Sequence, residues 1–109
     1  IPLWVFKSDT YLKACIRGMI DTDGTVLPIT GRDYTYIWFT SNIPKLRRSF
    51  EKAMRQLGYK IAKWNHNVNR GSETYIGAKS LILKYYKEIG FNNPKHKKRF
   101  MIPIQKCSI

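Results

Sequence analysis

Residues 16–24 read IRGMIDTDG, which places two carboxylates, Asp21 and Asp23, at the end of a predicted helix. A helix dipole carries partial negative charge at this end and disfavours a carboxylate by a few tenths to about 1 kcal/mol. The chain has only 7 Asp and Glu residues against 20 Lys and Arg. A divalent cation would relieve the repulsion, because hard cations prefer carboxylate oxygens. An ordinary helix-to-strand turn is the alternative, whereas a calcium loop would need further acids.

The same helix carries small residues on one face, with Ala14, Gly18 and Thr22 at positions i, i+4 and i+8. Small residues at this spacing let two helix backbones approach closely. A glycine inside a helix costs about 1 kcal/mol relative to alanine, so some packing should compensate for Gly18. A second helix would do so, and packing on the domain's own sheet is the alternative.

Working outward from this stretch, hydrophobic periodicity and Gly or Pro punctuation predict three helices and four strands in a single domain over residues 1–109. The predicted segments are a helix over 9–22, strands over 25–30 and 34–40, a helix from near 42 to 58, strands over 59–67 and 73–77, and a helix over 78–89. The order αββαββα indicates an α+β fold, in which an antiparallel four-stranded sheet carries its helices on one face.

Composition restricts the function classes further. The net charge is +13 and the sequence pI is about 10.0, which indicates an anionic partner such as nucleic acid or a membrane surface. No apolar run approaches the roughly 20 residues that span a bilayer, and no signal peptide is recognisable. The two cysteines form no CxxC pair and are expected to be reduced thiols, so we expect an intracellular protein of the cytoplasm or an organellar matrix.

The nine residues resemble the LAGLIDADG motif of homing endonucleases. All but Arg17 and Thr22 match it identically or by apolar type, and an arginine in the second place is a familiar variant in intein-type and archaeal members. The predicted segment order is also that of the family. Residues 1–5 (IPLWV) and 89–98 (IGFNNPKHKK) are similar to the segments that flank the domain in intein-encoded members, so the resemblance covers nearly the whole chain.

The resemblance implies a sequence-specific endonuclease that hydrolyses phosphodiester bonds of double-stranded DNA with Mg²⁺, or with another divalent cation such as Mn²⁺ or Ca²⁺. Asp23 would hold the metal. Asp21 would have a structural role at the helix end, and would join Ala14, Gly18 and Thr22 in a helix interface. Because the chain has one motif, a homodimer reading a near-palindromic site, or a partner half-domain, would supply the second acid.

Two further catalytic candidates follow from the resemblance. Lys97, and after it Lys98, match the family's lysine after the third helix and could stabilise charge at the reacting phosphate. The alternative is that this basic run is a solvated face or a phosphate clamp. The polar residue that closes the second strand in the family matches Ser41 or Asn42. Asn42 would position water, although it could instead cap the second helix.

DNA would be read by the open sheet face and its turns. The expected contacts are Arg32 in the first hairpin turn, Asn69 and Arg70 in the second, Tyr34, Tyr36, Trp38, Lys63 and Asn65 along the strands, and Lys95 and Lys98 after the third helix. Alternating Tyr and Trp residues could instead belong to the core, because a slip of one residue swaps the faces of a strand.

A non-catalytic nucleic-acid-binding module on the same fold, either an intron RNA maturase or a DNA-binding regulator, is the competing hypothesis. The charge of +13 suits both functions and does not discriminate them. The presence of Asp23 favours the enzyme, because a protein that only binds nucleic acid gains little from a carboxylate that faces the phosphates.

Overall fold

The structure is a computed structural model that describes residues 1–28, 34–67 and 71–107. Its elements are the 3-10 helix η1 (Leu3–Lys7), α1 (Asp9–Asp23), β1 (Gly24–Pro28), β2 (Thr35–Ser41), α2 (Pro44–Gln56), β3 (Asn65–Asn67), β4 (Gly71–Ile76), α3 (Lys79–Glu88) and α4 (Pro94–Cys107). Four of these are strands of one sheet, so the predicted α+β class is confirmed.

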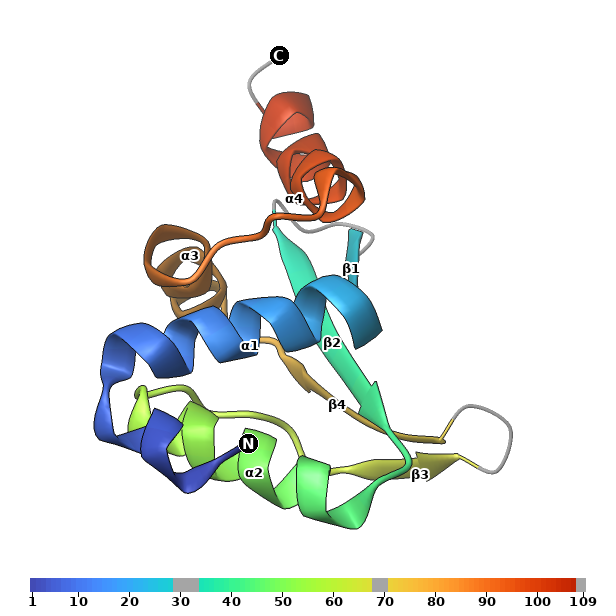
Figure 1. Cartoon of the computed structure of the whole chain (residues 1–109). Helices are drawn as coiled ribbons and strands as arrows, with labels where there is room; N and C mark the ends of the chain where they lie inside the picture. Colours follow the sequence, from blue (N-terminus) through green and yellow to red (C-terminus); the bar gives the residue numbers. More distant parts are fainter. Residues whose placement is uncertain (29–33, 68–70, 108–109) are drawn as a thin grey trace.

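The sheet has the strand order β1-β2-β4-β3, and every neighbouring pair is antiparallel. Its register pairs Gly24 with Phe39 between β1 and β2, and Thr40 with Glu73 between β2 and β4. Figure 1 shows α1 running across the sheet between α3 and α2. The other face of the sheet is free of helices α1, α2 and α3, as the segment order predicted.

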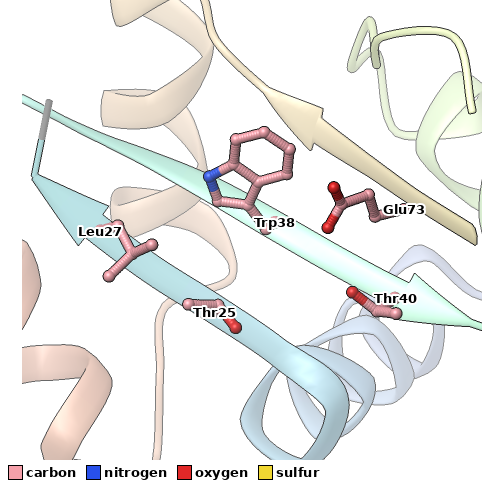
Figure 2. A pocket seen from close by; sticks show the side chains of 5 residues that line it. All are labelled: Thr25, Leu27, Trp38, Thr40 and Glu73. Atoms are coloured by element: carbon pink, nitrogen blue, oxygen red, sulfur yellow. The ribbon is translucent and has the colours of Figure 1, made fainter. Parts of the chain in front are cut away.

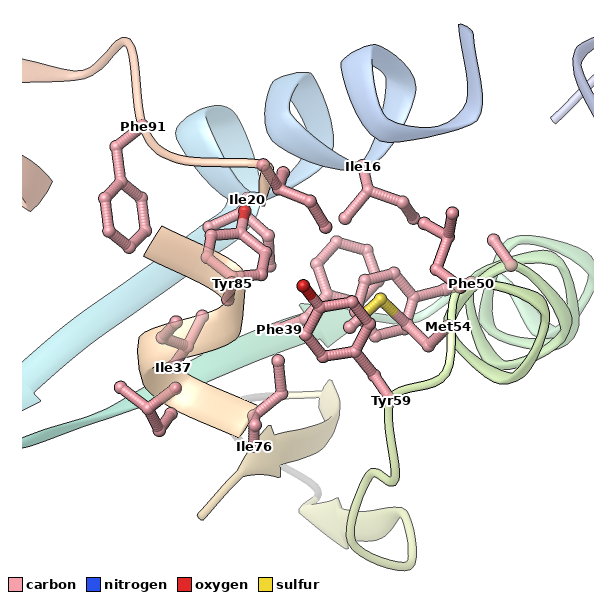
Figure 3. Close-up of a cluster of buried hydrophobic side chains, with 14 of the residues drawn as sticks. Ile16, Ile20, Ile37, Phe39, Phe50, Met54, Tyr59, Ile76, Tyr85 and Phe91 are labelled. Atoms are coloured by element: carbon pink, nitrogen blue, oxygen red, sulfur yellow. The ribbon is translucent and has the colours of Figure 1, made fainter. Parts of the chain in front are cut away.

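The core lies between the sheet and these helices (Figure 3). Leu12, Ile16 and Ile20 of α1 are at most 1% exposed and form the apolar stripe by which the helix packs on the sheet. Across from them, the Phe39 ring of β2 stacks on Phe50 of α2 at 4.3 Å between centroids. Full burial of a side chain of this size stabilises the fold by about 1.5–3 kcal/mol. These contacts therefore fix α1, and with it the acidic turn, on the sheet.

The strand predicted over 59–67 is mostly wrong, because only Asn65–Asn67 form β3. Gly58 has φ 87° and turns the chain after α2, and Tyr59 is then buried to 4% exposure. Further along, the Ala62 carbonyl accepts a hydrogen bond from the Thr74 hydroxyl at 2.6 Å. The Thr74 hydroxyl thus donates to a carbonyl that the backbone N–H of a neighbouring strand would otherwise reach. The segment therefore follows β4 without the regular backbone hydrogen bonds of a strand.

Helix α4 was not predicted. The helix begins at Pro94. The side chain of the preceding residue, Asn93, accepts a hydrogen bond from the Lys95 backbone N–H at 3.0 Å. His96 and Phe100, one turn apart, are buried at 5% and 2% exposure, and α4 packs against β1 and β2. The Asn-Pro start and this i, i+4 spacing are helix signals that the surrounding lysines obscured.

Candidate nucleic-acid interface and acidic turn

The acidic turn joins the end of α1 directly to β1. The Gly24 backbone N–H donates to the Ile20 carbonyl, and a Cβ at position 24 would lie 2.5 Å from that oxygen. Only glycine fits this junction, so the strand can begin immediately after the helix. The Asp23 side chain is exposed. Since Gly24 pairs with Phe39, continuing the register by one step places Asp23 at the level of Thr40 on β2.

Asp21 has a different environment from Asp23. Its carboxylate accepts backbone N–H groups of Asn92 and Asn93 at 3.0–3.2 Å, and the Asn93 side chain donates to the Asp21 carbonyl at 3.0 Å. The carboxylate therefore faces this chain's own segment before α4. The structural role that the resemblance implied fits these bonds, and the place of Asp21 in a helix interface stays a prediction.

Two more long-range hydrogen bonds hold this end of α1. Arg17, which departs from the motif, donates through Nε to the Ile89 carbonyl at the end of α3, at 2.6 Å. A cation suits this position because helix C-termini carry partial negative charge. The buried His96 Nε2 lies 3.0 Å from the Ile20 carbonyl.

Burial, and secondarily the Asp21 carboxylate, raise the pKa of Tyr85 beneath this region, so its phenol stays protonated.

The small-residue face of α1 is turned away from the core. Ala14, Gly18 and Thr22 are all exposed, and a Cβ built on Gly18 would meet no atom within 4 Å. The alternative that this face packs on the domain's own sheet is therefore wrong. Tyr11 and Trp4, which are 58% and 62% exposed, lie edge to face at 6.0 Å and extend the uncovered surface beyond the helix start.

A family model, that of the LAGLIDADG-like domain, matches residues 10–90, which include the acidic turn and the whole four-stranded sheet. The chain belongs to the LAGLIDADG family. No characterised protein and no solved structure matches it significantly. This LAGLIDADG domain is accordingly of the homing endonuclease or maturase-like type, a group that acts on nucleic acid.

The open face of the LAGLIDADG sheet carries the side chains that β2 turns away from the core. Thr35, Ile37 and Phe39 are buried, whereas Tyr36 and Trp38 are half-buried on the opposite face. The predicted placement of Tyr36 and Trp38 on the open face is thus confirmed. Through the register, Thr25, Leu27 and Thr40 join them, together with Glu73 and Tyr75 of β4.

Aromatic rings dominate the middle of this face. Tyr75 stacks on Tyr36 at 5.1 Å with an interplanar angle of 6°, and it also lies 4.6 Å from Trp38. Tyr34 is only 9% exposed, with its ring 6.1 Å from Tyr36, so it offers DNA little surface of its own. Sequence reasoning named neither Tyr75 nor Glu73, although strand alternation on β4 was the signal that could have found them.

The other predicted DNA contacts divide into two groups. Asn65 pairs with Glu73 in the sheet register and therefore shares the open face, and Lys63 nearby is exposed. Arg32, Asn69 and Arg70 lie outside the described residues.

The predicted catalytic residues after β2 and at the start of α4 are at the surface. Lys95, Lys97 and Lys98 are exposed on the first turns of α4. Asn42 is exposed and does not cap α2, because the N-cap residue is Ile43. The Asn42 side chain lies against Gly71, where a Cβ would collide with its Oδ1. The capping alternative for Asn42 is wrong, which leaves its amide available.

A metal site complete within one chain is not found. Over residues 1–28, 34–67 and 71–107, no three His, Cys, Asp or Glu side chains gather closely enough to hold an ion.

In the same part of the chain, no helix is long and apolar enough to cross a membrane.

Proposed function

We propose that this chain is a divalent-metal-dependent, sequence-specific endonuclease for double-stranded DNA that acts as a homodimer or with a partner half-domain. The observation that carries the proposal is the contrast between the two acids of the turn. Asp21 is occupied by backbone N–H groups of residues 92 and 93. Asp23 is exposed, and no described side chain bonds to it.

The chemistry of Asp23 fits a magnesium ligand. Its carboxylate is a hard oxygen donor at a helix C-terminus, where a cation is favoured by the dipole. One chain offers one such acid, so Asp23 of two copies would hold the metal between them. Bound Mg²⁺ would polarise the phosphate and lower the pKa of a coordinated water. Lys97 would stabilise charge on the phosphate, and Asn42 would orient the water.

The exposed small face of α1 supports the pairing of two copies. A Cβ built on Gly18 would meet no atom of the described residues within 4 Å, and Ala14 and Thr22 continue the same exposed surface. Two such faces packed together would place both copies of Asp23 at the centre of the assembly, because Asp23 ends the same helix. A symmetric pair would read a near-palindromic site.

Cleavage of a randomised duplex-DNA library in Mg²⁺ tests the proposal. The parent chain should cut at a near-palindromic sequence, and Asp23→Asn should lose cutting while it keeps DNA binding. Asp9→Asn, the same substitution at the other end of α1, is the matched control and should cut normally. Cutting by Asp23→Asn would overturn the proposal. Binding without cutting by the parent dimer would instead identify a non-catalytic module, such as an RNA maturase or a DNA-binding regulator.

A further inference from the structure

A shallow hollow of about 280 Å³ lies on the open face of the sheet, outside the acidic turn. It is lined by Thr25 and Leu27 of β1, Trp38 and Thr40 of β2, and Glu73 of β4. Figure 2 shows these side chains rising from the same side of the three strands. The hollow therefore combines an apolar wall, two hydroxyls and one carboxylate on the surface that would face DNA.

Glu73 is an unusual residue for this position. Among the described residues, ion pairs form only at Lys13–Glu88 and Arg55–Glu51, and no hydrogen bond reaches the Glu73 carboxylate. Its cross-strand neighbours, Thr40 and Asn65, are neutral. In a chain of net charge +13, a carboxylate on the binding face repels phosphates and weakens association. It is favourable there only if a donor on the ligand compensates for this repulsion.

The major groove of DNA offers such donors on two bases. A carboxylate only accepts hydrogen bonds, so guanine and thymine, which present O6, N7 or O4 acceptors, are unfavourable. Adenine presents its N6 amino group beside the N7 acceptor, which would repel a carboxylate. Cytosine presents its N4 amino group beside the apolar C5 edge. The hollow matches cytosine best, because the Trp38 ring, on the neighbouring strand and diagonal to Glu73, supplies an apolar wall beside the carboxylate.

We infer that Glu73 is a specificity-determining residue that selects a cytosine in the major groove, with Trp38 against the C5 edge of the base. This inference rests on the proposed binding of double-stranded DNA, but not on cleavage. In a homodimer the same preference would occur once in each half-site. A glutamine in this place would instead both donate and accept, which is the pattern that pairs with the N6 and N7 groups of adenine.

Selection of bound sequences from a randomised duplex library, in EDTA so that no strand is cut, tests the inference. The parent chain should enrich cytosine at one position of each half-site by about tenfold or more. Glu73→Gln should change this preference to adenine, and Glu73→Ala should lose it. Both variants should bind random DNA more tightly, because a repulsive charge is removed. Glu51→Gln, an equal charge change on α2, should keep the cytosine preference.

Two contrary results are distinguishable. Sequence-selective binding that is identical in the parent, Glu73→Gln and Glu73→Ala, with matching unfolding temperatures, would overturn the role of Glu73 and leave the proposed function intact. No selective binding of any duplex by the folded parent chain would overturn the DNA-binding proposal itself.

Discussion

Asp21 and Asp23 lie two residues apart at the end of α1. Of these two carboxylates, only that of Asp21 accepts hydrogen bonds from other described parts of the chain. The hydrogen bonds from residues 92 and 93 make Asp21 part of the structure. Asp23 stays exposed at a helix terminus that disfavours its charge. The two carboxylates should therefore respond in opposite ways to loss of charge.

We expect Asp21→Asn to lower the free energy of unfolding by about 1.5–3 kcal/mol, because a charged acceptor of backbone N–H groups is lost. Asp23→Asn should leave stability unchanged or raise it by a few tenths of a kcal/mol, because the dipole penalty is removed. Urea denaturation of both variants beside the parent measures the difference. Equal destabilisation by the two substitutions would contradict this division of roles.

At this scale the sequence indicated the acid pair and, through the resemblance, the role of each acid. It did not indicate their partners. Asn92 and Asn93, which bind Asp21, are about 70 residues away, and nothing in the local pattern of 16–24 points to them. Strand alternation could have placed Glu73 on the open face, but the absence of a charged neighbour on the adjacent strands is visible only once the three strands are aligned.

The two faces of helix α1 differ in what covers them. Its apolar face is covered by the sheet, whereas no described residue covers the exposed face around Gly18. Gly18→Ala should raise the free energy of unfolding of the single chain by up to about 1 kcal/mol, through helix propensity. Gly18→Leu should fold but lose dimerisation. Sedimentation measures the mass of each variant, with Arg48→Leu on exposed α2 as control. A stable Gly18→Leu dimer would place the interface elsewhere.

Phe100 is a buried aromatic anchor of helix α4. Phe100 is 2% exposed and stacks on Tyr86 of α3 at 4.5 Å. Phe100→Ala should lower the free energy of unfolding by about 3–5 kcal/mol, the usual cost of removing a buried phenylalanine ring. Thermal unfolding followed by circular dichroism provides the measurement. Lys98→Ala, on an exposed position of the same helix, should leave the unfolding temperature unchanged, and a comparable loss there would contradict the packing.

Helices α1, α2 and α3 and the pair of strands β1 and β2 could be predicted, because periodicity and Gly or Pro punctuation agree along them. The 59–64 segment and α4 could not, for opposite reasons. In the first, apolar residues with strand spacing are held irregularly by tertiary contacts such as that of Thr74 with Ala62. In the second, His96 and Phe100 are the buried residues over 94–101, the part of α4 whose side chains the structure describes, and four cations interrupt the apolar signal there.

For the whole molecule, the charge of +13 predicted an anionic partner, either nucleic acid or a membrane surface, without indicating which surface of the chain meets it. The structure narrows the choice, because Lys63 is the exposed cation next to Asn65, which lies on the open face, whereas Lys52 is exposed on α2. Sequence periodicity indicates which residues share a helix or strand. Which face of the molecule carries the positive charges depends on how the helices pack on the sheet.

Lys63→Ala should weaken DNA binding and lower the slope of log affinity against log salt concentration by about 0.9, the value for one lost phosphate contact. Lys52→Ala, which removes the same charge from α2, should change neither. Fluorescence anisotropy across a series of salt concentrations gives both slopes. Equal effects of the two substitutions would show that DNA does not approach the open face.

The ties between the end of α1 and residues 89–96 have a consequence for synthesis. Arg17, Ile20 and Asp21 bind partners 71 to 76 residues later in the chain. A ribosome releases the motif long before it releases those partners, and contacts of such separation form late in folding. A nascent chain therefore carries its acidic turn without the bonds that fix it, and the proposed nuclease would be assembled only when the last part of the domain has emerged.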